Sequence, residues 1–328
     1  MARKFNVKKR SIPRIIGLSL GVFLIFLMVG PFLVPVPKLE GLQPPENLAD
    51  NDSLFIDIHE LTIHYKTIGK DDPVFILLHG FGASLYSWQT IMQPLSEVGT
   101  VIAYDRPAFG LSERPLDWEG ESPYSLQAQV DILLGLMDNF GIQRAILVGN
   151  SAGGTVAMKF YLQHPDRVDA LILVDPAVYT NGGPGDGIKW LLQTPQMRHL
   201  GPLFARQIQV RGPELLELAW YDPSKLTDKM IELYEKPLQV ENWDLALWYL
   251  TIAMNDSRLD QQLAEFTLPI LVITGEADKI VPTEQSIRLA EELPDATLVV
   301  IPEAGHVPHE EQPELFMASL VNFVAKLP

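Results

Sequence analysis

The pattern of apolar and polar positions predicts eight strands after residue 53. The stretch "LFIDIHELTIHYKTIG", residues 54–69, is interrupted by a polar turn and predicts a β-hairpin. Six further short apolar runs are bounded by turn residues: "VFILLHG", "TVIAYD", "AILVGN", "ALILVDP", "ILVITG" and "TLVVIP". The later runs lack alternation, as expected for parallel strands covered on both faces, and amphipathic stretches such as residues 126–140 lie between them. The pattern predicts an α/β fold with a doubly wound, mostly parallel sheet.

A long helical insertion interrupts this alternation. More than ninety residues between "ALILVDP" and "ILVITG" contain no convincing strand, which is too long for a simple crossover. We therefore expect core segments at residues 53–176 and 261–328, with a helical insertion at residues 177–260 between them. The insertion holds four of the six tryptophans, which we expect to pack into a small core of its own, with some lining an apolar pocket beneath it: Trp190, Trp220, Trp243 and Trp248.

The N-terminal region predicts a membrane anchor. Residues 15–34, "IIGLSLGVFLIFLMVGPFLV", carry no charge and would span roughly 30 Å as a helix, about one hydrocarbon core. A cleaved signal peptide would have a shorter apolar region and a small-residue cleavage site, so an uncleaved anchor is favoured over a signal peptide or a buried core helix. The basic tail, residues 1–14, should stay in the cytoplasm, which puts everything after residue 34 on the far side. Residues 35–52 hold four prolines and predict an extended linker.

The amino-acid composition limits the classes of molecule and the kinds of chemistry expected for this protein. The formal net charge is -16, but six of the 25 basic residues lie in the first fourteen positions, so the remaining 314 residues carry 19 basic and 41 acidic side chains, a net of -22. Such a body repels phosphate backbones, which argues against nucleic acid as a partner. The chain has no cysteine, which excludes disulfides, thiolate nucleophiles and cysteine-ligated zinc. The sequence gives no indication of an oligomeric state.

The stretch "AILVGNSAGG", residues 145–154, predicts an exposed nucleophile. Its GxSxG pattern is weak alone, but here it directly follows a predicted strand and leads into a plausible helix, "GTVAMKFYLQH". Small residues on both sides of Ser151 suit a sharp turn that brings neighbouring backbone close. The N-terminus of the following helix would favour negative charge developing at the site. These features predict a nucleophile elbow at Ser151.

A serine hydroxyl needs a base and a carboxylate to become nucleophilic. His306 lies in a glycine-containing loop after the last predicted strand, and Asp278 lies just beyond the strand before it. Both loops open at the carboxyl edge of a doubly wound sheet, which is the edge where the elbow lies. We therefore expect Ser151, Asp278 and His306 to meet there. Asp175, at the end of "ALILVDP", is the rival candidate for the acid.

The order Ser151, Asp278, His306 and the motifs around them resemble the α/β-hydrolase fold superfamily. The resemblance covers residues 53–328 and is carried by "HGFGAS", "YDRPAFGLSERP", "GNSAGG", "GEADKIVP" and "GHVPHEEQP", in that order. It implies that the helical insertion is a cap domain over the substrate pocket. It also implies an oxyanion hole formed by the backbone amides of Phe81 and Ala152. His79 would then orient the loop that carries Phe81.

Other polar residues in these motifs are expected to be structural. Asp105 and Arg106 should brace loops through an ion pair or hydrogen bonds, and Ser84 and Ser112 are expected to be ordinary turn serines. His309 and Glu310 lie near His306, but no HExxH helix accompanies them, so a metal site is disfavoured and His309 is expected to make structural hydrogen bonds. We expect no metal or other cofactor.

The predicted chemistry is acyl transfer. Superfamily members similar to haloalkane dehalogenases and epoxide hydrolases carry aspartate at the elbow, whereas serine there favours an acyl-enzyme. We therefore expect a membrane-anchored carboxylesterase or lipase that acts on an apolar ester, with a monoacylglycerol-like molecule as one candidate. Alternatives are a carbon–carbon bond hydrolase of the meta-cleavage type, whose members often read GNSxGG at the elbow, and a cofactor-free perhydrolase or haloperoxidase. A non-catalytic binding module is a further alternative, although such modules typically lose a member of the triad and none is missing here.

Overall fold

The computed structural model describes residues 12–179 and 183–327, and its centre is a single eight-stranded sheet with the order β1-β2-β4-β3-β5-β6-β7-β8. β1 pairs antiparallel with β2, β2 pairs antiparallel with β4, and the remaining neighbours are parallel. This confirms the predicted hairpin and the doubly wound, mostly parallel sheet. The strands are β1 (Leu54–Ile58), β2 (Leu61–Ile68), β3 (Val74–Leu78), β4 (Thr100–Tyr104), β5 (Ala145–Asn150), β6 (Val168–Val174), β7 (Ile270–Gly275) and β8 (Ala296–Ile301).

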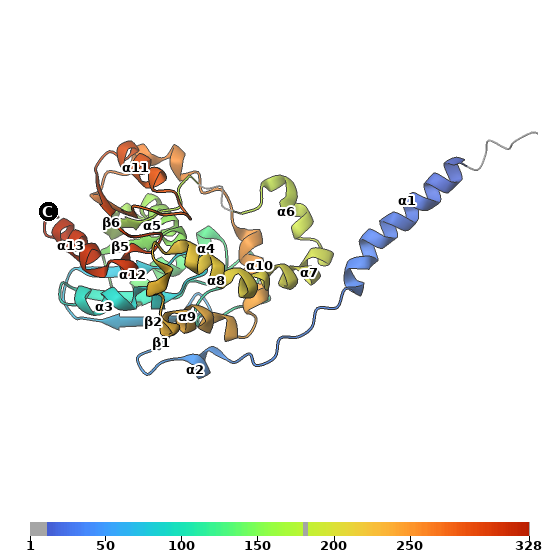
Figure 1. The fold of residues 1–328 in the computed structure, drawn as a ribbon, viewed down its shortest axis with the longest axis horizontal. Helices are drawn as coiled ribbons and strands as arrows, with labels where there is room; N and C mark the ends of the chain where they lie inside the picture. Colours follow the sequence, from blue (N-terminus) through green and yellow to red (C-terminus); the bar gives the residue numbers. More distant parts are fainter. Residues whose placement is uncertain (1–11, 180–182, 328) are drawn as a thin grey trace, which may run out of the picture.

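Helices cover both faces of the sheet (Figure 1). α4 (Leu126–Asn139), α5 (Ala152–Gln163) and α11 (Thr283–Glu292) pack on one face, and α3 (Gln89–Leu95), α12 (Pro308–Glu311) and α13 (Pro313–Val324) lie on the other. Along β3, Ile76 and Leu78 join the first apolar cluster whereas Phe75 and Leu77 join the second. Because successive side chains of a strand point to opposite faces, a continuous apolar run is required where both faces are covered.

Short 3-10 helices are η1 (Gly30–Leu33), η2 (Leu85–Trp88), η3 (Pro165–Arg167), η4 (Pro223–Lys225), η5 (Lys236–Gln239), η6 (Leu259–Gln261) and η7 (Leu263–Glu265).

Five α-helices and no strand of the sheet occupy residues 183–269, between β6 and β7: α6 (Asp186–Leu192), α7 (Pro195–Ala205), α8 (Gln207–Ala219), α9 (Asp228–Glu235) and α10 (Trp243–Ala253). We refer to this segment as the cap. The run "GIKWLLQTPQM" divides into two helices because the Thr194 side chain accepts a hydrogen bond from the Met197 amide and Pro195 follows, so α7 begins there. Three of the four tryptophans are buried, Trp220, Trp243 and Trp248, whereas Trp190 is 68% exposed, so the expectation that it packs into the core of the insertion is wrong.

One helix among the described residues is long and apolar enough to cross a membrane, over Ile16–Leu33, and none of that window is buried. It comprises α1 (Ile12–Val29) and η1, and Figure 1 shows α1 extending away from the body. Residues 1–11 of the predicted basic tail lie outside the described residues.

The predicted linker differs from a free tether, because part of it packs on the body. It contains the short helix α2 (Pro45–Leu48). Gln43 forms a β-bridge with Val240 of the cap. The Asp50 carboxylate accepts hydrogen bonds from Lys66 of β2 at 3.0 Å and from Lys236 of the cap at 2.8 Å. Proline content alone could not reveal these contacts, because their partners lie far away in the sequence.

Candidate active site

Ser151 lies in a sharp turn between β5 and α5, as the sequence predicts. Its φ of 51° is in the left-handed region, and its side chain is buried. Glycines flank the turn because there is no room for side chains: a Cβ on Gly149 would lie 2.6 Å from the Gly153 backbone. A Cβ on Gly153 would lie 2.1 Å from the Leu78 carbonyl oxygen. The GxSxG pattern is therefore a packing requirement of the turn that presents Ser151.

His306 and Asp278 are in direct contact. The Nδ1 atom of His306 and the Oδ2 atom of Asp278 lie 2.7 Å apart. The other oxygen of Asp278 accepts hydrogen bonds from the backbone amides of Ile280 at 2.7 Å and Val281 at 3.0 Å. When the Asp278 carboxylate accepts the Nδ1 proton, Nε2 of the His306 ring is free to accept a proton.

Asp175 lies close to this pair but does not bind His306. Its Oδ1 atom accepts hydrogen bonds from the Thr274 hydroxyl at 2.6 Å and the Gly275 amide at 3.1 Å. Burial, and then the nearby Asp278 carboxylate, raise the pKa of Asp175 well above its usual value, which favours the uncharged acid. Ligand atoms of Asp175, Asp278 and His306 all lie within 4.8 Å of one another, close enough to surround a cation. However, Asp278 and His306 each commit one of these atoms to the other, which suits proton transfer better than metal ligation.

The loop after β3 carries Phe81, the predicted oxyanion donor. The Nε2 atom of His79 accepts the Arg106 backbone amide at 3.1 Å, so the ring proton lies on Nδ1 and is donated to the Gly80 carbonyl at 2.8 Å. The Arg106 guanidinium also donates to the Gly80 carbonyl, at 3.0 Å. Burial, and then the Arg106 charge, lower the pKa of His79 to about 3, so the ring is neutral. This arrangement agrees with the expectation that His79 orients the loop.

Ser151 and His306 line one chamber of about 310 Å³ beneath the cap. Most of its other lining residues are apolar, and α8 contributes Ile208, Leu215 and Leu216. Of the described residues that line it, none is Lys or Arg, and Glu235 is the one carboxylate. Phe81 lies between this chamber and a smaller cavity of about 100 Å³, lined in part by Ala152. A carbonyl group beside Ser151 would have room for a large apolar substituent on one side.

Comparison with known proteins settles the family. Residues 73–313 match the family model described as the alpha/beta hydrolase fold. The chain belongs to the α/β hydrolase fold family.

Individual relatives in this family cover most of the chain. A 2-hydroxy-6-oxo-6-phenylhexa-2,4-dienoate hydrolase of Burkholderia cepacia is 29% identical over 83% of this chain and 96% of its own length. Among solved structures, a variant of the meta-cleavage product hydrolase CumD is 27% identical, with a TM-score of 0.65 over 83% of this chain and 98% of that one. A membrane phospholipase A described as a bacterial virulence factor is 23% identical, with a TM-score of 0.64 over 97% of this chain and 99% of that one, and this match shows the fold alone. The first two of these proteins favour the carbon–carbon alternative over the ester hydrolase that the sequence ranked first.

The α/β hydrolase core and the cap are joined at the loop that carries His306. The His306 amide donates to the Ala219 carbonyl of α8 at 2.6 Å. The Glu311 carboxylate accepts from the Gly305 amide at 2.6 Å and from the Tyr221 amide of the cap at 2.7 Å. Glu311 therefore holds the histidine loop against the cap. Sequence reasoning missed this residue because it considered only His309 and Glu310 of this motif, as possible metal ligands.

Glu310 forms a second contact between core and cap. The Tyr234 hydroxyl of α9 donates to the Glu310 carboxyl group at 2.5 Å. Burial raises the pKa of Glu310 to about 8, although the hydrogen bond from Tyr234 opposes that shift. At neutral pH this side chain is therefore mostly uncharged inside the protein.

The His309 side chain does not make the structural hydrogen bonds that the sequence suggested, although the backbone carbonyl accepts one from Thr90 at 3.0 Å. Its ring stacks on Trp88 with a centroid distance of 4.2 Å, and neither ring nitrogen has a hydrogen-bond partner among the described residues. Burial lowers the pKa of His309 to about 3, so the ring stays neutral and packs as an aromatic group. That prediction is wrong because the helix that carries His309 turns the ring into the apolar layer between the sheet and α13.

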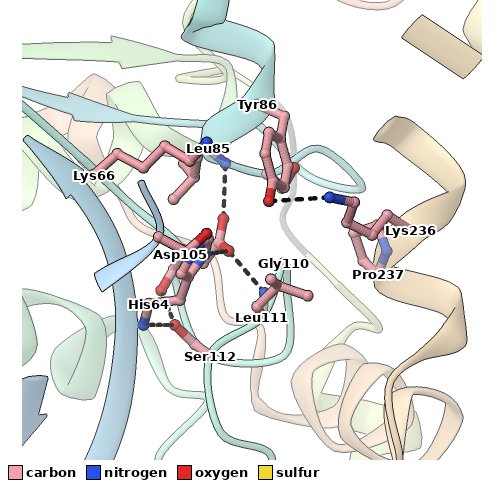
Figure 2. Close-up of polar contacts among 12 residues, drawn as sticks. His64, Lys66, Leu85, Tyr86, Asp105, Gly110, Leu111, Ser112, Lys236 and Pro237 are labelled. Carbon is pink, nitrogen blue, oxygen red and sulfur yellow. Dashed lines mark hydrogen bonds and ion pairs between the residues drawn. The ribbon is translucent and has the colours of Figure 1, made fainter. Parts of the chain in front are cut away.

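Asp105 braces loops through hydrogen bonds, as expected, but its partner is His64 rather than Arg106 (Figure 2). The Asp105 carboxylate contacts His64 Nδ1 at 2.6 Å and accepts the backbone amides of Leu85 and Leu111, both at 2.7 Å. Ser112 donates to the Asp105 carbonyl at 2.6 Å. Asp105 is not among the described residues that line the chamber, and we interpret this buried cluster as structural.

Proposed function

We propose that the chain is a serine hydrolase that attacks the carbonyl carbon of an apolar substrate through an acyl-enzyme. The observation that carries this proposal is that Ser151 and His306 line one largely apolar chamber while His306 contacts the Asp278 carboxylate. In the proposed mechanism Ser151 attacks the carbonyl carbon, His306 removes the hydroxyl proton and returns it to the leaving group, and Asp278 fixes the histidine tautomer. The amides of Phe81 and Ala152 would stabilise the tetrahedral oxyanion.

A carboxylic ester without charge is the substrate class that the chamber supports best. Its described lining lacks Lys and Arg and includes Glu235, so an anionic substrate would lack a partner and would meet a like charge. The apolar residues from α8 suit an acyl chain. These observations support a carboxylesterase or lipase.

Hydrolysis of a carbon–carbon bond is the second candidate, because the 27% identical solved structure is named a meta-cleavage product hydrolase and the 29% identical relative a 2-hydroxy-6-oxo-6-phenylhexa-2,4-dienoate hydrolase. Their substrate names end in dienoate, so those molecules carry a carboxylate. Arg106 lines the smaller cavity beyond Phe81. Its guanidinium, however, already donates to Gly80 and Gln129, which weakens this candidate.

A substrate panel separates the two candidates. We suggest measuring kcat/KM for p-nitrophenyl esters of graded acyl length and for 2-hydroxy-6-oxo-6-phenylhexa-2,4-dienoate, with the native chain and Ser151→Ala. We expect turnover of the longer esters and a loss of about 10⁴-fold or more in kcat in the variant. Preferential cleavage of the dienoate would select the second candidate. If Ser151→Ala retained native turnover, or if a fluorophosphonate probe failed to label Ser151, the serine hydrolase proposal would be wrong.

We also propose that the apolar N-terminal helix is an uncleaved anchor, with residues 1–14 in the cytoplasm and the body on the far side. The length and hydropathy of Ile16–Leu33 support an anchor, and the basic residues before it support the orientation. Fusion of compartment-specific reporters to the C-terminus tests this topology. We expect activity from a reporter that works only outside the cytoplasm, and the opposite result would reverse the orientation.

A further inference from the structure

The cap is bound to the end of the apolar helix. The Gln196 side chain of α7 donates to the Met28 carbonyl of α1 at 3.1 Å. The His199 Nε2 atom lies 2.9 Å from the Val34 carbonyl, and its ring lies 5.6 Å from the Phe32 ring. These three contacts fix the first half of α7 against the last turns of the helix. Figure 1 shows α6 and α7 on the side of the body that faces α1.

The contact with Met28 sets a depth for α7 once the helix crosses a bilayer. The apolar span ends at Leu33, five residues after Met28. At 1.5 Å per residue in an α-helix and about 2.0 Å in a 3-10 helix, Met28 lies roughly 7 to 10 Å inside the end of that span. A side chain of α7 that reaches this carbonyl therefore places the start of α7 at the level of the lipid headgroups or below. This step rests on the anchor proposed above.

The surface of α6 and α7 is suited to that environment. Ile188 is 46% exposed, Trp190 68% and Leu191 41% on α6, and Phe204 is 56% exposed on α7. The Trp190 indole N–H already donates to the Gly187 carbonyl at 2.9 Å, so its ring can enter an apolar layer without leaving a donor unpaired. Tryptophan is enriched at the interface between lipid and water.

The segment formed by α6 and α7 also differs from the rest of the body in its charge. Residues 186–205 contain one acidic and two basic side chains, Asp186, Lys189 and Arg198, whereas the chain after residue 14 has a net charge of -22. A strongly acidic surface would be repelled by anionic lipids, but this segment would not.

We propose that the α6–α7 corner, residues 186–205, lies in the headgroup layer of the same bilayer that holds α1. The cap is then a peripheral membrane element, attached both by the anchor and by its own exposed apolar side chains. α8 follows α7 almost directly and supplies a wall of the chamber, so the chamber lies next to the lipid surface. A substrate dissolved in the bilayer would reach it over a short path.

Spin labels can test this placement, because the chain has no native cysteine to remove. We suggest single nitroxide labels at Trp190→Cys and at the control Leu315→Cys, in the full chain reconstituted into phosphatidylcholine vesicles. Leu315 is 45% exposed on α13, which lies at the opposite end of the body (Figure 1). The ratio of collision rates with oxygen and with a water-soluble nickel complex reports immersion in lipid. We expect this ratio to be several-fold higher at position 190 than at position 315.

A third label, at Leu24→Cys in α1, separates failure of this inference from failure of the anchor. If position 24 is immersed in lipid and position 190 is as accessible to the nickel complex as position 315, the anchor stands and the docked corner is refuted. If position 24 is also accessible to the nickel complex, both the anchor and the docked corner are refuted. Neither reading depends on the hydrolase activity. Labelling at Ile188→Cys guards against a local effect of replacing Trp190 and should give the same immersion.

Discussion

The Arg106 guanidinium and the Gly80 carbonyl oxygen lie 3.0 Å apart, in a hydrogen bond that joins a buried cation to the peptide unit whose N–H belongs to Phe81. A cation on the carbonyl oxygen polarises that peptide and fixes its orientation. The Arg106 guanidinium therefore supports the peptide of the expected oxyanion donor from its carbonyl side.

This relationship predicts a selective loss of turnover when Arg106 is replaced. We expect Arg106→Met to lower kcat by about 10- to 100-fold with little change in KM, because the supported donor acts mainly on the developing oxyanion. Affinity for an apolar trifluoromethyl ketone, whose adduct carries an oxyanion, should fall by a similar factor. Arg114→Met is the matched control, since Arg114 is equally buried but donates to the Gly110 and Pro237 carbonyls. Equal losses of kcat in both variants would assign Arg106 a purely structural role.

The two buried aspartates should respond differently to substitution. Asp278→Asn keeps a carbonyl oxygen for the Ile280 and Val281 amides but turns an N–H donor toward His306 Nδ1, so the tautomer is wrong and we expect kcat to fall by about 10³- to 10⁴-fold. Asp175→Asn replaces a group that burial and the neighbouring carboxylate already favour as uncharged, so we expect a loss of less than about tenfold. Steady-state kinetics on one ester compares the variants. A larger loss with Asp175→Asn would reassign the acid to the end of β6.

Glu310 should make stability depend on pH. Its pKa is about 8 in the folded protein against 4.5 for the free group, so between these values the folded state holds a proton that the unfolded state has lost. The free energy of unfolding therefore declines as pH rises from about 4.5 to 8, by at most about 1.4 kcal/mol per pH unit from this group. Glu310→Gln should flatten that decline in denaturant titrations between pH 5 and 9. An unchanged slope would contradict a protonated Glu310.

Replacing a glycine by alanine should change stability very differently at the elbow and at a position with open space around it. We expect Gly153→Ala to destabilise the protein by more than about 3 kcal/mol, because the new methyl group would overlap the Leu78 carbonyl oxygen. Gly212 of α8 has no atom within 4 Å of an added Cβ, and Gly212→Ala should be neutral or stabilising by up to about 1 kcal/mol. Chemical denaturation measures both. Similar stabilities for the two variants would show that the elbow backbone adapts to a side chain.

The sequence alone determined the layered sheet, the elbow at Ser151 and the positions of Asp278 and His306, because these depend on local periodicity and on the rule that parallel strands end at one edge. It could not choose between Asp175 and Asp278 on geometry, since both follow parallel strands at that edge. The tertiary structure shows which of them contacts His306: Asp278 does so while accepting the backbone amides of Ile280 and Val281, whereas Asp175 accepts hydrogen bonds from Thr274 and Gly275.

Contacts between distant segments could likewise not be predicted from the sequence. Glu311 binding Tyr221, Asp50 joining Lys66 to Lys236, and the exposure of Trp190 depend on how the cap and linker pack on the core. An apolar or acidic residue has the same local pattern whether its face meets protein, water or lipid. Only the packing of elements remote in the chain determines which of these each side chain contacts.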